Sequence, residues 1–308
     1  MTTFRVALVA LGLVLSASAT AQASPGHVSS RIQITGKVGP RRAQRIARYW
    51  TPARMREARP MGELGAQRAV STPLEATLSA RAVTTPTVYP YSTAGRIFLK
   101  TKHVAAWCSG VAVNTPTRRV VLTAGHCLSD REGQARYPEV TQYLEFVPGY
   151  TNGSAPFGKF VMEVGYVLNA WRKSENPNFD MGAVLTYPNV LGQNVADATG
   201  GGANVAFNLP TEQEFTIVGY PGADQQRMQT CDGDFARNNP FSRGRGGPAQ
   251  MLASCYLKAG SSGGPWFVGE PPVLDGLTSE TVQLHAYNHY LSSPYFGSGN
   301  VGALLEGL

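Results

Sequence analysis

Short apolar runs separated by turn residues constrain the fold of this chain more than any other feature of its sequence. After residue 95, segments rich in Val, Ile, Leu, Phe and Tyr alternate with segments rich in Gly and Pro. Such a pattern predicts short strands, because Gly and Pro interrupt each run before it reaches the length of a typical helix. The runs predicted to be strands are 104–113, 119–123, 144–147, 159–167, 181–185, 214–218, 251–256, 265–268 and 282–289. Many short strands with little helix between them predict an all-β fold of barrels.

A histidine and a serine stand in glycine-containing motifs on either side of a candidate acid. Residues 123–127 read Thr-Ala-Gly-His-Cys, and residues 260–265 read Gly-Ser-Ser-Gly-Gly-Pro. A serine hydroxyl becomes nucleophilic when an imidazole takes its proton, and a carboxylate fixes the tautomer of that imidazole. We therefore expect His126 to be the base, Asp180 the orienting acid and Ser262 the nucleophile. Backbone N–H groups of Gly260 and Ser262 would stabilise the oxyanion formed on the attacked carbonyl.

These motifs resemble those of the chymotrypsin-like serine peptidases, in which the chain order is also His, Asp, Ser. Residues 178–184, Asn-Phe-Asp-Met-Gly-Ala-Val, are similar to the Asp-x-Gly-Ala pattern of the bacterial V8-like or glutamyl-endopeptidase branch. The resemblance covers about residues 95 to 304. It implies two six-stranded antiparallel β-barrels, at about 95–198 and 199–308, with the active site between them. The implied function is that of a secreted serine endopeptidase that acts through an acyl-enzyme intermediate.

Four cysteines are present in the chain, and four cysteines allow three disulfide pairings. The resemblance selects Cys108 with Cys127 and Cys231 with Cys255. A zinc site is the alternative, but no C-x-x-C spacing occurs to support it. The Asp-Gly-Asp sequence at 232–234 is more typical of a turn than of a calcium site. We therefore expect no metal and no cofactor.

The first residues of the chain have the composition of an export signal. Residues 1–23 combine Arg5, an apolar run over 6–15 and a closing Ala-Gln-Ala. This order predicts a signal peptide and therefore a secreted protein, either extracellular or periplasmic. The apolar run is too short to span a bilayer.

The segment 24–94 is predicted to be a basic propeptide or leader. Residues 24–81 carry eleven basic and three acidic side chains, whereas residues 82–308 carry 15 basic and 17 acidic ones. Clustered arginines can bind nucleic acid or a membrane surface, but few aromatic residues are interleaved with them here. Repeated prolines argue against an independently packed domain, although a short helix is predicted around 43–49. The peptidase domain is expected to cover 95–308.

Substrate specificity is predicted from residues on either side of the nucleophile. Tyr256 stands six residues before Ser262, where trypsin-like relatives carry an aspartate, so specificity for Lys or Arg is disfavoured. The resemblance implies that 255–259 and 284–287 form the walls of the first specificity pocket. His285 lies on the second wall, where glutamate-specific relatives carry a histidine, so we expect a preference for Glu. The usual continuation His-Trp-Gly-Gly is replaced here by His-Ala-Tyr-Asn-His, which leaves a purely structural role for His285 open.

Activation is expected to differ from that of trypsin-like zymogens. Those zymogens carry an aspartate directly before the nucleophile, which binds the newly freed N-terminal amine, whereas this chain has Ser261 there. Removal of the leader would then act in another way, such as unblocking the cleft. We expect cleavage between residues 61 and 93.

Two other functional classes fit parts of the sequence. Residues 260–264 also match G-x-S-x-G of α/β-hydrolases, with Asp275 and His285 following in the required order. That fold needs a helix directly after the serine, which Pro265 and the apolar residues after it oppose. A catalytically silent peptidase homologue that binds a partner through its cleft is the second alternative, although no triad member has been lost. We expect protein or peptide substrates, no nucleic-acid or membrane partner, and a monomer.

Overall fold

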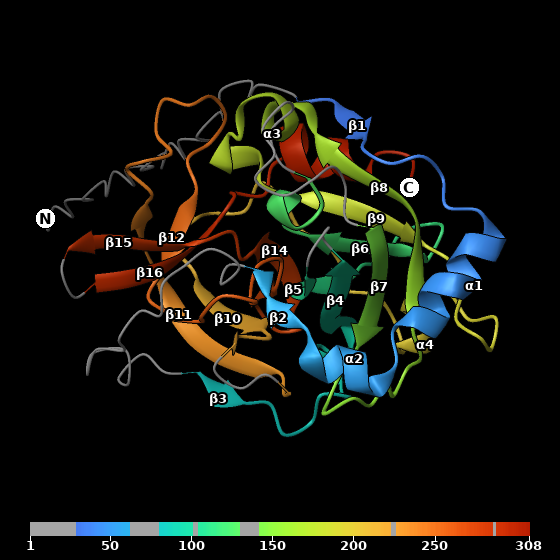
Figure 1. Cartoon of the computed structure of the whole chain (residues 1–308). Coiled ribbons are helices and arrows are strands. Elements are labelled where there is room, and N and C mark those ends of the chain that lie inside the picture. Colours follow the sequence, from blue (N-terminus) through green and yellow to red (C-terminus); the bar gives the residue numbers. More distant parts are fainter. Residues whose placement is uncertain (1–28, 62–79, 101–103, 130–141, 223–225, 286–287) are drawn as a thin grey trace, which may run out of the picture.

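The chain is built around two antiparallel β-sheets that lie side by side (Figure 1). The computed structural model describes residues 29–61, 80–100, 104–129, 142–222, 226–285 and 288–308. The predicted signal peptide and the segment 62–79 lie outside these ranges. The predicted all-β class and two-barrel architecture are confirmed.

The first sheet closes into a six-stranded barrel. Its strand order is β8-β7-β4-β5-β6-β9, and β9 pairs with β8 again to complete the circle. The strands are β4 (Ala94–Lys100), β5 (Ala105–Ala112), β6 (Val120–Thr123), β7 (Gln142–Pro148), β8 (Phe160–Leu168) and β9 (Gly182–Thr186). Ile97, Phe98 and Leu99 of β4 are completely buried, because the N-terminal segment covers the outer face while the barrel core covers the inner one.

The second sheet also curls back on itself. Its order is β14-β13-β10-β11-β12-β16-β15. The strands are β10 (Glu214–Gly219), β11 (Gln229–Asn238), β12 (Met251–Ala253), β13 (Pro265–Val268), β14 (Val273–Leu277), β15 (Thr281–His285) and β16 (Asn288–Ser293). Only residues 278–280 separate the end strands β14 and β15. The Ser279 N–H donates to the Ser292 carbonyl oxygen, and the Ser292 N–H to the Glu280 carbonyl oxygen, so the sheet closes at β16.

The segment 29–61 folds onto the outside of the first barrel. Strand β1 (Arg31–Gln33) pairs with β8, helix α1 (Pro40–Tyr49) lies over β7 and β8, helix α2 (Pro52–Glu57) follows, and β2 (Arg59–Pro60) pairs with β5 (Figure 1). Pro40 begins α1, as a proline in the first turn allows. The predicted helix is confirmed and is three residues longer at its start. Ile46, Trp50, Met55 and Met61 are almost fully buried and join the core of the barrel.

The remaining elements are short. Strand β3 (Arg81–Ala82) pairs with β11, and three brief helices are α3 (Asn169–Ser174), α4 (Val195–Ala198) and α5 (Ala303–Leu305). Among the described residues, none of the helices combines the length and apolar character needed to cross a membrane.

Candidate active site

His126 lies in a tight turn that follows strand β6. Residues Gly125–Cys127 form a single 3-10 turn directly after that strand. Position 125 accepts only glycine without rearrangement, since a Cβ there would lie 2.9 Å from Cδ1 of Trp171 and 3.1 Å from Oδ1 of Asp180. The Trp171 ring stands beside the imidazole, with 6.4 Å between the ring centroids. The turn therefore fixes the imidazole between the barrel and α3.

Asp180 holds His126 through two hydrogen bonds. Its carboxylate is 3% exposed and accepts the His126 backbone N–H on Oδ1 at 2.8 Å. Oδ2 lies 2.8 Å from Nδ1 of the His126 ring. Nδ1 therefore carries the proton that faces the carboxylate, and the lone pair needed for general-base catalysis is on Nε2.

Ser279 is a third partner of this pair that the sequence did not indicate. Its hydroxyl donates to Oδ2 of Asp180 at 2.6 Å. Ser279 belongs to the second sheet, whereas His126 and Asp180 belong to the first, so this bond joins the two barrels at the site. It stands in no motif, and only the closure of the second sheet at β16 brings it to the carboxylate.

The environment of Asp180 keeps it ionised. Burial alone would raise the pKa of the carboxyl, but the charge of His126 and the hydrogen bonds from His126 and Ser279 lower this pKa below its ordinary value. A carboxylate in this state stabilises the imidazolium that forms when His126 takes a proton.

Ser262 lies in a loop that packs against both barrels. A Cβ on Gly263 would lie 2.2 Å from the Thr123 hydroxyl oxygen, and one on Gly264 would lie 2.1 Å from the Val218 carbonyl oxygen. Neither position leaves room for a side chain. Strand β13 begins at Pro265, three residues after Ser262, which excludes the helix that an α/β-hydrolase places there.

The peptide bond before Gly260 is oriented by its neighbours. Gly260 has a φ of +97°, and a Cβ on it would lie 2.5 Å from Nε1 of Trp107. The Ala259 carbonyl oxygen accepts the Gly222 N–H at 2.8 Å. In a trans peptide the N–H points opposite to the C=O, so the Gly260 N–H is directed away from Gly222.

Ser109 of β5 holds the nucleophile loop from the first barrel. Its hydroxyl donates to the Gly260 carbonyl oxygen at 2.9 Å and accepts the Tyr220 N–H at 2.9 Å. Its backbone N–H donates to the Ser262 carbonyl oxygen at 2.8 Å. Sequence reasoning missed this residue. Its one mark in the sequence is that it directly follows Cys108, which is predicted to form a disulfide.

His126, Asp180 and Ser262 line one cleft of about 440 Å³. One wall is formed by 257–259, as the sequence predicted for part of the pocket. The second wall is formed by 278–281, six residues earlier in the chain than the predicted 284–287, with Leu291 behind it. Arg245 and Lys258 bring positive charge to the cleft, while Glu175 and Glu280 bring negative charge.

Tyr256 and His285 are the two residues outside the triad that are predicted to contact substrate. The Tyr256 ring packs against His289, with 5.3 Å between ring centroids, and among the described residues it is not part of the cleft wall. The backbone of His285 ends β15 and pairs with Asn288, while its side chain lies outside the described part of the structure.

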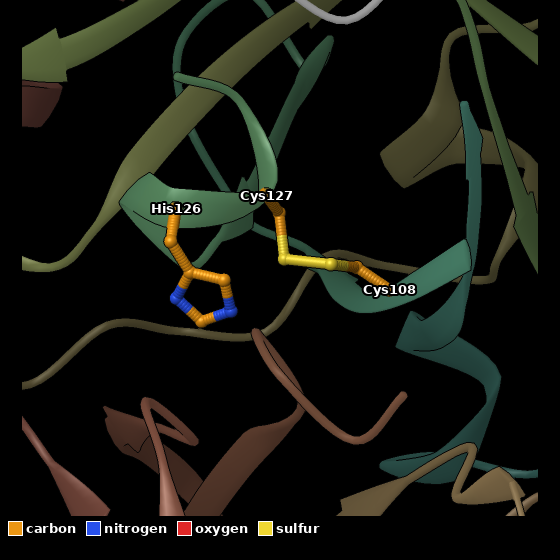
Figure 2. A group of neighbouring side chains, drawn as sticks. All are labelled: Cys108, His126 and Cys127. Carbon is orange, nitrogen blue, oxygen red and sulfur yellow. A yellow bond between two sulfur atoms is a disulfide. The ribbon is translucent and has the colours of Figure 1, made fainter. Parts of the chain in front are cut away.

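Both expected disulfides are present. Cys108 pairs with Cys127 and Cys231 with Cys255, with Cα–Cα distances of 6.3 and 6.1 Å. Figure 2 shows the first of them beside the His126 ring. The two sulfur atoms and a ring nitrogen lie within 4.8 Å of one another. Metals bind cysteine as a thiolate, and sulfurs that are bonded to each other cannot supply one, so this group is a clamp on the histidine turn.

Comparison with known families agrees with this geometry. The family model described as the trypsin-like peptidase domain matches residues 108–270, more than half of the chain. The chain belongs to this family. The matched part of the trypsin-like domain contains His126, Asp180, Ser262 and all four cysteines, and it ends before Ser279.

Solved structures similar to this trypsin-like peptidase chain include two bacterial or extremophile proteases. The thermostable serine protease AL20 from an extremophilic microorganism has 26% identity and a TM-score of 0.61, over 70% of this chain and 95% of its own. The protease Anisep from Arthrobacter nicotinovorans has 28% identity and a TM-score of 0.60, over 71% and 94%. A Glu endopeptidase with 17% identity and a TM-score of 0.56 shares the fold, over 73% and 94%.

One curated relative also matches. It is the extracellular metalloprotease of Bacillus subtilis (strain 168), which is 29% identical over 105 residues. The match covers 33% of this trypsin-like chain and about a third of the length of the relative.

Proposed function

We propose that this protein is a serine endopeptidase of the V8-like branch, with His126, Asp180 and Ser262 as its catalytic triad. The observation that carries the proposal is the set of contacts around Asp180, which ties Nδ1 of His126 and the hydroxyl of Ser279 to one buried carboxylate. The cleft that contains this pair also contains Ser262.

The proposed reaction has two halves. In the first, Nε2 of His126 takes the proton of the Ser262 hydroxyl while Oγ attacks the carbonyl carbon of the substrate. The developing oxyanion is stabilised by the N–H groups of Gly260 and Ser262. His126 then gives its proton to the leaving amine, the C–N bond breaks, and an acyl-enzyme remains. In the second half, water replaces the amine and the same proton transfers release the acid.

We propose further that the protein acts outside the cytoplasm, after removal of a signal peptide and cleavage of the chain between the leader 24–94 and the peptidase domain. Two disulfides support an oxidising compartment. The AL20 and Anisep chains align over 95% and 94% of their length but over only 70% and 71% of this one. This difference supports a domain to which an additional segment has been joined.

A preference for Glu before the cleaved bond remains a hypothesis. It is supported by Lys258 and Arg245 in the cleft, and by the position of His285 on the strand that begins with Thr281 of the cleft wall. Glu280 on the same wall opposes it. The comparison that tests it is cleavage of matched peptides with Glu or Gln at that position by the parent and by Lys258→Ala and His285→Ala. If His285 binds the substrate carboxylate, the ratio of kcat/KM for the Glu peptide to kcat/KM for the Gln peptide falls in His285→Ala.

The triad itself is tested by covalent labelling with a fluorophosphonate, which reacts with an activated serine and not with an ordinary one. We expect the parent to be labelled and to hydrolyse peptides, and Ser262→Ala to do neither. The control is Ser92→Ala, which removes a serine hydroxyl that is not part of the cleft and that donates to the Thr199 carbonyl oxygen. A folded parent that is neither labelled nor active would favour the silent homologue.

A further inference from the structure

One edge of β5 faces the nucleophile loop. The opposite edge of this strand pairs with β4 from Ala105 to Val111. On the edge facing the loop, the Ser109 N–H donates to the Ser262 carbonyl oxygen. Because the backbone groups of successive residues point to alternate edges of a strand, Trp107 presents its N–H and C=O on the same edge as Ser109. The edge therefore runs directly past the nucleophile.

Strand β2 of the N-terminal segment occupies this edge. Arg59 is opposite Ala106 and Pro60 is opposite Trp107, in parallel orientation. Pro60 is buried and also contacts the loop, since a Cβ on Gly260 would lie 3.1 Å from Cβ of Pro60. β2 thus reaches the glycine whose N–H is proposed to stabilise the oxyanion.

The residues of β2 are not part of the lining of the cleft described above. An acyl group bound between 257–259 and 278–281 has its carbonyl at Ser262. The part of a peptide beyond the cleaved bond must continue away from those walls, past Gly260 and along β5. Extended peptides commonly bind by adding a strand to an available sheet edge. Next to the nucleophile, that edge is already paired.

Burial and hydrogen bonds anchor the segment that carries β2. Trp50 and Met55 are each 1% exposed. The Trp50 ring lies 5.3 Å from that of Phe98, and its indole N–H donates to the Tyr143 carbonyl oxygen at 2.5 Å. The Lys159 ammonium donates to the carbonyl oxygens of Ala47 and Trp50, at 2.6 and 2.9 Å, where α1 ends. A substrate would have to displace a packed segment.

We propose that β2 determines specificity on the leaving-group side of the active site. While residues 29–61 remain docked, substrates with a small leaving group are cleaved and peptides that extend beyond the cleaved bond are excluded. This inference rests on the proposed peptidase function. Since its anchors all lie within 29–61 and the barrel, the exclusion persists after cleavage of the chain beyond residue 61.

The test uses the chain with residues 29–61 present and two substrates with the same acyl half. One substrate ends in a 4-nitroanilide, and the other continues for three residues beyond the cleaved bond. We expect kcat/KM of the parent for the anilide to exceed that for the extended peptide by about tenfold or more. Trp50→Ala should raise kcat/KM for the extended peptide by about tenfold and leave the anilide unchanged. Met55→Ala, a smaller deletion in the same segment, should act in the same direction and covers the case in which Trp50→Ala does not fold.

Gln44→Ala is the matched control, because Gln44 lies on the exposed face of α1. It should behave as the parent does. Equal kcat/KM for both substrates in the parent, or no change in their ratio in either folded anchor variant, would overturn the inference. Failure of the peptidase proposal is distinguishable, since then neither substrate is hydrolysed by any variant.

Discussion

The His126–Asp180 pair is held by the hydroxyl of Ser279 from the opposite barrel. This hydrogen bond should affect kcat more than substrate binding. Ser279→Ala removes the 2.6 Å hydrogen bond to Asp180 and leaves Oδ2 with only the imidazole. We expect kcat to fall by about tenfold with little change in KM, since one charge-assisted hydrogen bond contributes about 1.5–3 kcal/mol. Steady-state kinetics on an anilide substrate measure both parameters. Rescue by Ser279→Thr, which restores a hydroxyl, distinguishes this role from packing.

Ser109 should position the oxyanion loop in a similar way. Ser109→Ala removes the bond to the Gly260 carbonyl and the acceptor of the Tyr220 N–H. The Gly260 peptide then gains freedom, and we expect kcat to fall about tenfold while binding of a ground-state product is retained. Affinity for a peptide aldehyde, which forms a tetrahedral adduct with an oxyanion, should fall with kcat. If affinity for product and aldehyde decline together, Ser109 acts only on the shape of the cleft.

Asp275 in β14 should make stability depend on pH. Burial raises the pKa of its carboxyl to about 7, and the hydrogen bond from Gln213 offsets this only in part. Between its ordinary pKa and about 7, the folded protein binds the proton more tightly than the unfolded chain. Stability therefore falls as the pH rises through this interval.

Asp275→Asn removes this dependence. We expect the loss of unfolding free energy between pH 5 and pH 8 to shrink by about 2 kcal/mol. Urea unfolding at the two pH values measures it. An unchanged difference would mean that Asp275 is ionised throughout.

The residues of the site were predictable where chemistry requires a motif. Gly125 and His126, and Gly260 with Ser262, stand together because the backbone has to fit closely there. Ser279 was not predictable, because one serine in the polar run 278–281 gives no indication of a partner 99 positions away. The predicted second wall, 284–287, lies largely outside the described residues, and the wall that the structure describes is formed by 278–281.

At the scale of elements, the longer strands that were missed are β4, β11 and β14, each of which contains a charged residue and a glycine. Strand β4 contains Arg96, which is fully buried and lies 4.2 to 5.6 Å from the centroids of four aromatic rings. Cation–π contacts of this kind make a charged core residue acceptable, but no hydrophobic pattern reveals them. Strands β11 and β14 were missed for a related reason, since both contain Asp and Gly.

The end of helix α1 is tied to the barrel by a buried ion pair. Lys159 lies 3.2 Å from the fully buried carboxylate of Glu145 and donates to two carbonyl oxygens of the N-terminal segment. Burial raises the pKa of Glu145 to about 8 despite this partner. At pH 9, where Glu145 is ionised, Lys159→Met should therefore lower the unfolding free energy by about 3 kcal/mol, because it strands the carboxylate and two carbonyl groups.

The comparison that checks this is a double-mutant cycle. Glu145→Gln together with Lys159→Met should recover part of the loss, because no charge then remains in the core. Additive losses in chemical denaturation would show that the two side chains act separately.

At the scale of the whole molecule, the two-barrel architecture was predictable because alternating short strands and turn residues run through most of the chain. The docking of residues 29–61 could not be predicted, because it depends on where Trp50 and Met55 contact the outer face of a barrel formed by distant strands. The composition of this segment is that of a solvated basic leader, and its arginines do remain largely exposed. The few apolar residues of segment 29–61 pack against the first barrel.

Each disulfide should stabilise the whole chain. They close loops between residues 19 and 24 positions apart. Replacing either pair by serine should lower the unfolding free energy by about 3 kcal/mol. Only loss of the pair beside His126 should also lower kcat, and comparison of the two variants by denaturation and kinetics tests this.

The bonds between the barrels also set how the enzyme would lose activity on heating. His126 and Asp180 belong to one barrel, Ser262 and Ser279 to the other, and the Ser109 contacts cross the same boundary. A separation of about 1 Å there breaks hydrogen bonds of the site without unfolding either sheet. Residual activity therefore measures whether the hydrogen bonds between the barrels are intact, whereas calorimetry measures unfolding of the sheets. A protein warmed until only the hydrogen bonds between the barrels break would be inactive but still folded, and it would regain activity on cooling.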